Sequence, residues 1–139
     1  MKNPDIRWHQ RFENFDKAVA NLREAVDMGV NTMSSLEKEG TVQRFEVAIE
    51  LAWKTLKDYL ESAGVLVEQT PRAVIKSAFS AGIVSNGQIL IDMVALRNSL
   101  AHTYDEASFE AAVLLVADKY LPAIEELHTW LTNRKGSDA

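Results

Sequence analysis

The chain has 139 residues, of which 47% are hydrophobic and 25% charged, and it contains no cysteine. This length predicts one domain over residues 1–139 with its own core. The absence of cysteine excludes disulfides and thiolate chemistry and fits a reducing, cytoplasmic location. The formal charge of −5 disfavours a general nucleic-acid binder, and no apolar run reaches the roughly 18 residues that a membrane span needs.

The N-terminal segment predicts one long helix, from Ile6 to the low thirties and ending before Gly40. Its apolar residues recur at alternating four- and three-residue steps, the pattern of a heptad seam: Trp8, Phe12, Phe15, Val19, Leu22 and Val26. We interpret these aromatic residues as core or dimer seam rather than as a ligand site.

A second helix is expected from Thr41, as the N-cap after Gly40, to a glycine stop at Gly64. Its buried face repeats at helical spacing: Phe45, Ile49, Ala52, Leu56 and Leu60.

Four polar or aromatic residues of this helix bear on function. Glu46 and Glu50 share a face, which could suggest metal ligands or an acid/base pair. Because no histidine or second carboxylate motif partners them, we favour solvation or ion pairing. Trp53 and Lys54 have the chemistry to stack on a base and bind phosphate. We favour the plainer interpretation, a packed indole beside a solvated ammonium.

Shorter elements follow. Residues 65–67 are β-branched but short and isolated, and we interpret them as a loop. Thr70-Pro71 predicts the start of a short third helix that ends near Gly82. Residues 85–88 are expected to supply the cap of the next helix, and Gln88 is placed for a capping box if Ser85 is the N-cap.

The central helix begins with the apolar run 89–95 and is apolar over most of its circumference, which is typical of a helix in the middle of a bundle or in an interface. Only Asp92, Ala95 and Ser99 form a strip suited to water.

Four chemically active groups stand at the end of this helix: Arg97, Asn98, His102 and Tyr104. Such groups are costly to bury without partners. On a regular helix they would span an arc of roughly 160°. Either the helix loosens near His102, or a second copy of the chain supplies the other half of a site.

Asp105 and Glu106 place negative charge at the start of the last helix, where the helix dipole favours it. Pro122 is expected to kink that helix, and the tail from Asn133 is expected to fray. Taken together, the elements predict an all-α protein, an antiparallel four-helix up-and-down bundle with one additional short helix.

Arg97, His102 and Tyr104, with Asn98 directly after the arginine, resemble the Arg-x4-His-x-Tyr signature of the HEPN superfamily. The segments Gln43-Arg44-Phe45-Glu46 and Glu50-Leu51-Ala52-Trp53-Lys54 resemble its branch of nucleotidyltransferase substrate-binding proteins. The two matches stand in the expected order and cover most of the chain. HEPN domains are all-helical and are often encoded beside minimal nucleotidyltransferases.

The resemblance implies a homodimer, a minimal nucleotidyltransferase partner, and a metal-independent endoribonuclease toxin that this partner neutralises. It implies Arg97, His102 and Asn98 as catalytic residues that act without a metal or other cofactor. A histidine with a pKa near 6.5 can move a proton at neutral pH, a guanidinium can hold charge growing on phosphate oxygens, and Asn98 would orient the histidine or bind phosphate. The expected ligand is single-stranded RNA or a nucleotide.

Alternatives stay open at each position. The resemblance implies Tyr104 as an acceptor of AMP from the partner, whereas the plain alternative is a tyrosine at a helix end. Arg97 and His102 could instead satisfy helix ends or pair with Asp92.

For the whole protein, the second function is a non-catalytic substrate-binding or scaffold subunit of a two-component nucleotidyltransferase, which the acidic charge favours. The motifs of a nucleotidyltransferase catalytic domain, of Gly-rich phosphate loops and of Cys/His metal sites do not occur.

Overall fold

The structure is a computed structural model that describes residues 4–102 and 105–137. Over these residues the chain is helical without a β-strand, which confirms the all-α class. The elements in chain order are α1 (Pro4–Asp27), a 3₁₀ turn η1 (Val30–Thr32), α2 (Ser35–Ser62), α3 (Pro71–Ser80), α4 (Gly87–Leu100), α5 (Glu106–Leu115), a π-helical turn η2 (Val116–Tyr120) and α6 (Leu121–Ser137).

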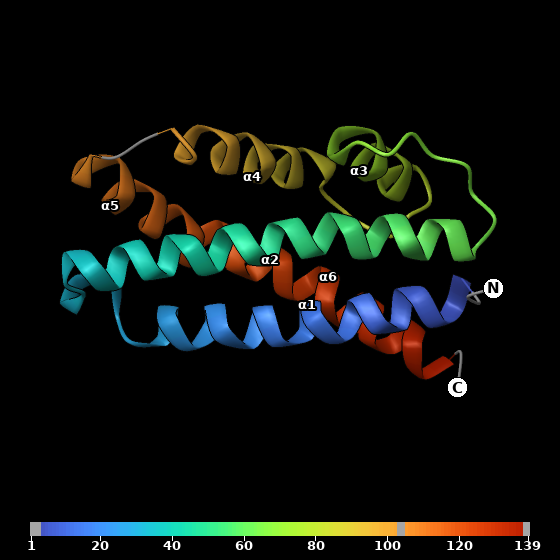
Figure 1. Ribbon diagram of the computed structural model, residues 1–139, viewed down its shortest axis with the longest axis horizontal. Helices are drawn as coiled ribbons and strands as arrows, with labels where there is room; N and C mark the ends of the chain where they lie inside the picture. The colour runs from blue at the N-terminus through green and yellow to red at the C-terminus, as the bar shows by residue number, and fades with distance from the viewer. Residues whose placement is uncertain (1–3, 103–104, 138–139) are drawn as a thin grey trace.

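The helices form an antiparallel bundle (Figure 1). α1 and α2 lie side by side along the long axis, and α4 runs along the other side of α2 in the opposite direction. α5, η2 and α6 continue one another and cross behind α2. Within the described residues the bundle therefore has four long helical elements and the short α3, as predicted.

The heptad seam of α1 forms the protein's own core. Trp8, Phe15 and Leu22 are fully buried, Phe12 and Val19 are nearly so, and Val26 is half-buried against the same core. The Trp8 ring meets Tyr59 of α2 edge-on, with 5.2 Å between ring centroids. α1 ends at Asp27, earlier than expected, because Gly29 adopts a φ of 93° that ends the helical path.

α2 starts earlier than predicted. Ser34 is its N-cap and forms a capping box with Glu37, so Gly40 and Thr41 lie inside the helix and the N-cap expected at Thr41 is wrong. The buried Thr41 hydroxyl donates to the Glu37 carbonyl at 2.8 Å, which satisfies it within the helix.

The predicted stop of α2 at Gly64 is confirmed. This glycine has a φ of 81°. The Val65 N–H donates to the Leu60 carbonyl at 2.9 Å and the Gly64 N–H to the Glu61 carbonyl at 3.0 Å, which is a Schellman ending. The following residues 65–67 form a loop, as expected.

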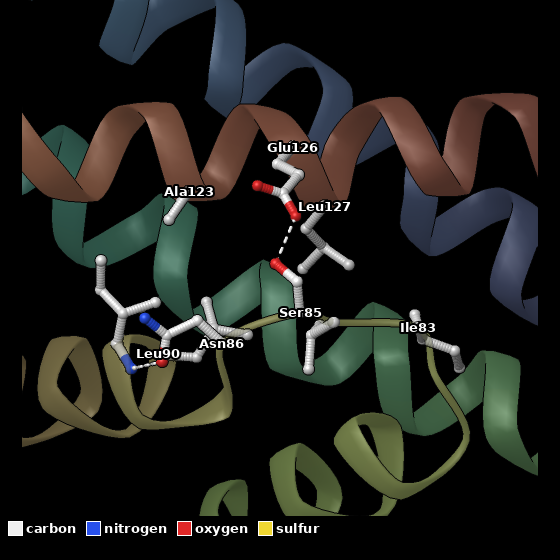
Figure 2. Close-up of a pocket in the computed structure, with 9 residues that line it drawn as sticks. Ile83, Ser85, Asn86, Leu90, Ala123, Glu126 and Leu127 are labelled. Atoms are coloured by element: carbon white, nitrogen blue, oxygen red, sulfur yellow. Dashed lines mark hydrogen bonds between the residues drawn. The ribbon is translucent and has the colours of Figure 1, made fainter.

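Thr70 caps α3 as predicted, with Pro71 at its first position. The cap of α4 comes from the predicted stretch 85–88: Asn86 accepts the Ile89 N–H at 3.2 Å, so the capping box that required Ser85 as N-cap does not apply. Figure 2 shows Ser85 turned instead toward α6, where its hydroxyl donates to Glu126 at 2.7 Å. The pocket between these side chains holds ≈ 30 Å³, about the space of one water molecule.

Asp105 is the N-cap of α5, and its carboxylate accepts the Ser108 N–H at 2.7 Å. A π-helical turn, η2, ends two residues before Pro122, where the sequence predicted a kink. Because proline lacks an N–H and its ring crowds the preceding turn, a widened turn relieves the clash. α6 continues to Ser137, so the frayed tail expected from Asn133 is wrong.

Candidate functional site

The C-terminal end of α4 presents the motif residues. The helix ends at Leu100, and Ala101 and His102 form a turn in which the His102 N–H donates to the Ser99 carbonyl at 3.2 Å. Of the two alternatives posed by the sequence, the structure shows the helix ending just before His102. His102 is exposed and Arg97 is half-buried one turn earlier.

The other residues of α4 follow the predicted pattern in part. Asp92, Ala95 and Ser99 are exposed, which confirms the predicted solvent strip, and Asn98 is exposed beside them. Tyr104, the expected AMP acceptor, lies outside the described residues.

Arg97 is paired with a carboxylate of another helix. Its Nη2 lies 3.3 Å from Glu50 Oε2 of α2, and the Arg97 side chain is 37% exposed. Its Nε is buried without an acceptor among the residues that the structure describes. The ion pair leaves part of the guanidinium available to a ligand, and the partner is Glu50 rather than the Asp92 considered from the sequence.

Besides Arg97, two further side chains contact the Glu50 carboxylate. Lys54 Nζ lies 3.1 Å from Oε1, and the Trp53 indole N–H donates to Oε2 at 3.2 Å. Partial burial raises the pKa of Glu50, but the bonds from Lys54 and Trp53 and the charges of Arg97 and Lys54 outweigh it and hold the pKa below its ordinary value. Of the two outcomes expected for Glu50, solvation or ion pairing, the structure shows ion pairing.

Glu46, one turn before Glu50, lacks such a set of donors. Burial raises its pKa, and the charge of Arg97 opposes that shift without cancelling it. Two carboxylates on one helix face therefore differ in their electrostatics, and both lie near Arg97.

Two adjoining grooves connect these residues. One of ≈ 450 Å³ runs past Glu50 and Arg97, and one of ≈ 540 Å³ reaches Leu100 and Ala101, next to His102. Gln43 and Glu46 line both. The remaining walls are apolar or acidic: Val47 and Leu51 in the first, and Leu36, Glu39, Gly40, Val42 and Phe109 in the second.

Sequence reasoning missed the roles of Gln43 and Glu50 in this arrangement. Both stand in the quoted Gln-Arg-Phe-Glu and Glu-Leu-Ala-Trp-Lys segments, but a contact between two helices has no signature in the spacing along either one. Arg44 of the same segment faces away, donating to the Asn21 carbonyl of α1 at 2.7 Å. It ties α1 to α2.

Among residues 4–102 and 105–137, no group of three His, Asp or Glu side chains is placed to hold a metal ion. In the same part of the chain, none of the helices combines the length and apolar character that crossing a bilayer requires.

The helical bundle, with an arginine and a histidine at the end of its central helix, defines a HEPN-type protein. The chain belongs to the family described as nucleotidyltransferase substrate binding protein like, which matches residues 10–133. A crystal structure of a protein from Thermus thermophilus is similar, with 29% identity and a TM-score of 0.70, covering 87% of this chain and 98% of that one. No curated protein matches the chain.

Proposed function

We propose that this protein pairs with a minimal nucleotidyltransferase and is a metal-independent endoribonuclease toxin that the partner neutralises. Family membership supports the pairing. The observation that carries the ribonuclease proposal is that Arg97 lies in the last turn of α4 and His102 is exposed two residues past its end, with two adjoining grooves lined by Arg97 and by Leu100 and Ala101.

The chemistry matches these residue types. In cleavage, the ribose 2′-hydroxyl attacks the neighbouring phosphorus in line, and the 5′-oxygen of the next nucleotide leaves, giving a 2′,3′-cyclic phosphate end. His102 moves the proton to or from one of these oxygens. Arg97 holds the charge that grows on the phosphate oxygens. Asn98, exposed beside Arg97, orients the histidine or contacts the phosphate.

We further propose that the active form is a homodimer. The groove beside Arg97 is lined by two apolar residues of α2, Val47, which is 49% exposed, and Leu51, which is half-buried. On α4, Val94 lies one turn before Arg97 and is also half-buried. Apolar surface next to polar motif residues suits an interface that brings two motif ends together.

The test is cleavage of a labelled single-stranded RNA by purified, unmodified protein in the presence of EDTA. Wild type should cut the RNA, and His102→Ala should be slower by about 10²–10⁴-fold because proton transfer is lost. His128→Ala is the control, because this histidine lies on α6, away from the motif, with its Nε2 2.6 Å from Asp16 Oδ1. If His102→Ala is folded by circular dichroism and cuts as fast as wild type, the ribonuclease proposal is wrong.

A second candidate is a non-catalytic substrate-binding or scaffold subunit of the nucleotidyltransferase. The observation that favours it is charge: Glu39, Glu46 and Glu50 line the grooves, and Glu50 pairs with Arg97. Expression of the chain with and without its nucleotidyltransferase separates the two. Toxicity that the partner relieves supports the ribonuclease, and growth unaffected by the chain alone supports the subunit.

A further inference from the structure

Three nitrogen-bearing side chains from two helices surround the Glu50 carboxylate, Trp53 through a hydrogen bond and Arg97 and Lys54 through ion pairs. Arg97 Nη2 and the Trp53 indole N–H share Oε2, at 3.3 and 3.2 Å, and Lys54 Nζ lies 3.1 Å from Oε1. An ammonium, a guanidinium and an indole N–H around one group of oxygens form the donor set that a phosphate accepts.

We propose that Lys54, Trp53 and Arg97 form a phosphate-binding site, which Glu50 occupies in the resting protein as an internal substitute for the ligand. This proposal rests on the proposed function for the identity of the molecule that carries the phosphate. It adds Lys54 and Trp53 as contacts to the phosphate that Arg97 would hold.

The site is open to a ligand. The side chains of Lys54, Glu50 and Arg97 are 36%, 27% and 37% exposed, and Glu50 and Arg97 line the groove of ≈ 450 Å³. Glu50 has rotatable bonds that allow its carboxylate to leave without a change in α2. Trp53 is half-buried and packs against the core, which fixes the direction of its indole N–H.

The local charge also fits an anion. With the Glu50 carboxylate withdrawn, Lys54 and Arg97 carry two positive charges, and the nearby acidic group is Glu46, whose pKa burial raises. Neighbouring cations of α2 are engaged elsewhere: Arg44 contacts Asn21 and Glu24 of α1, and Lys57 lies 3.7 Å from Asp58. Lys54 and Arg97 are thus the two cations at the Glu50 carboxylate, and Arg97 lines the groove itself.

The experiment is a titration with inorganic phosphate, followed by the indole N–H signals in nitrogen–proton correlation spectra. The chain has three tryptophans, so Trp53→Phe assigns the Trp53 signal. Glu50→Gln keeps the size of the side chain but removes the competing charge. We expect the Trp53 signal of this variant to reach half-saturation at a phosphate concentration at least about fivefold lower than in wild type.

Glu61→Gln is the matched control. Glu61 also lies on α2, is 28% exposed, and pairs with an arginine, Arg7, at 3.5 Å. The Glu61→Gln substitution changes the net charge by the same amount but away from the site. The phosphate concentration at half-saturation should therefore stay within about twofold of wild type. Adding Lys54→Met to Glu50→Gln should abolish the gain.

Equal phosphate affinity in the Glu50→Gln and Glu61→Gln variants would overturn the proposal, as would a gain that survives Lys54→Met. Titrating Glu50→Gln with AMP and with a short single-stranded RNA identifies the phosphate carrier as the one that binds more tightly. This binding is measured without catalysis. A protein that binds phosphate but does not cleave RNA therefore refutes only the ribonuclease proposal. A protein that cleaves RNA but shows no Trp53 response to phosphate refutes only the phosphate-binding site.

Discussion

Glu46 and Glu50 show at the level of single residues how donors decide a carboxylate's behaviour. Both lie on one face of α2 near Arg97. Burial raises the pKa of each, and at Glu46 the charge of Arg97 opposes it incompletely. At Glu50 the added bonds from Lys54 and Trp53 reverse the net direction. The ionised form is therefore favoured at Glu50 and disfavoured at Glu46.

This difference predicts a pH dependence for Glu50→Gln. Because the pKa of Glu50 is lower in the folded than in the unfolded state, its contribution is present above the unfolded value of about 4.3 and disappears as pH falls through the folded pKa. At pH 7 the variant should be less stable than wild type by about 0.5–1 kcal/mol, as is usual for a partly exposed ion pair.

Urea unfolding of both proteins at pH 7 and at pH 3 measures the effect. The difference between them should be smaller at pH 3 than at pH 7. Other acid-sensitive groups, such as Glu37 and Asp105, whose pKa values are also lowered, cancel in the comparison. A difference that stays constant or grows on acidification would refute the assignment.

At the level of the elements, local chemistry predicted several boundaries and missed others. Thr70-Pro71 and Gly64 carry their signals within one or two residues, and both were right. The start of α2 was missed because Gly40 suggested a break, whereas Ser34 and Glu37 supply a capping box six residues earlier. Residues 85–88 were right as the cap of α4, but the sequence could not decide between Ser85 and Asn86, because the contact of Ser85 with Glu126 of α6 is not visible in it.

The two glycines of α2 should respond oppositely to alanine. Gly40 lies inside the helix with open space at its Cβ position, so Gly40→Ala should stabilise the protein by about 0.5–1 kcal/mol. Gly64 has a φ of +81°, so Gly64→Ala should destabilise it by about 1 kcal/mol. Urea unfolding of both variants checks the signs, and equal effects would show that α2 does not span these bounds.

The candidate site was also predicted from the sequence only in part. Arg97, Asn98 and His102 could be picked from the sequence because they break an otherwise apolar helix and match a spaced motif. The pairing of Arg97 with Glu50 could not, because it joins α4 to α2 across the bundle. The register between two helices is set by their packing, not by the spacing within either.

For the whole molecule, we predict a homodimer. The seam of α1 no longer supports it, since those residues fill the core. Val47 and Leu51 beside the Arg97 groove support it instead. Light scattering at micromolar concentration should give twice the 15.5 kDa of one chain, and Val47→Glu should shift the mass toward the monomer by burying a charge in the interface. A wild-type protein that is monomeric at that concentration contradicts the prediction.

We also predict that the nucleotidyltransferase partner modifies Tyr104. An added AMP would place a bulky, negatively charged group near a site that must admit phosphate. Intact mass after co-expression should show one added AMP, which Tyr104→Phe removes. Asp105→Asn, a change at the next residue that keeps the tyrosine, is the control. Unmodified wild-type protein in the presence of an active partner and ATP would exclude the modification.

The central claim is that Arg97 and His102 act in one transition state, and a double-mutant cycle of RNA cleavage rates tests it most directly. His102→Ala should lose about 10²–10⁴-fold and Arg97→Ala about 10²–10³-fold, with each variant shown to be folded. Because residues that act as a unit are not additive, the double variant should lose far less than the product of the two. A double variant whose loss equals that product would show that the two residues act independently and would contradict the claim.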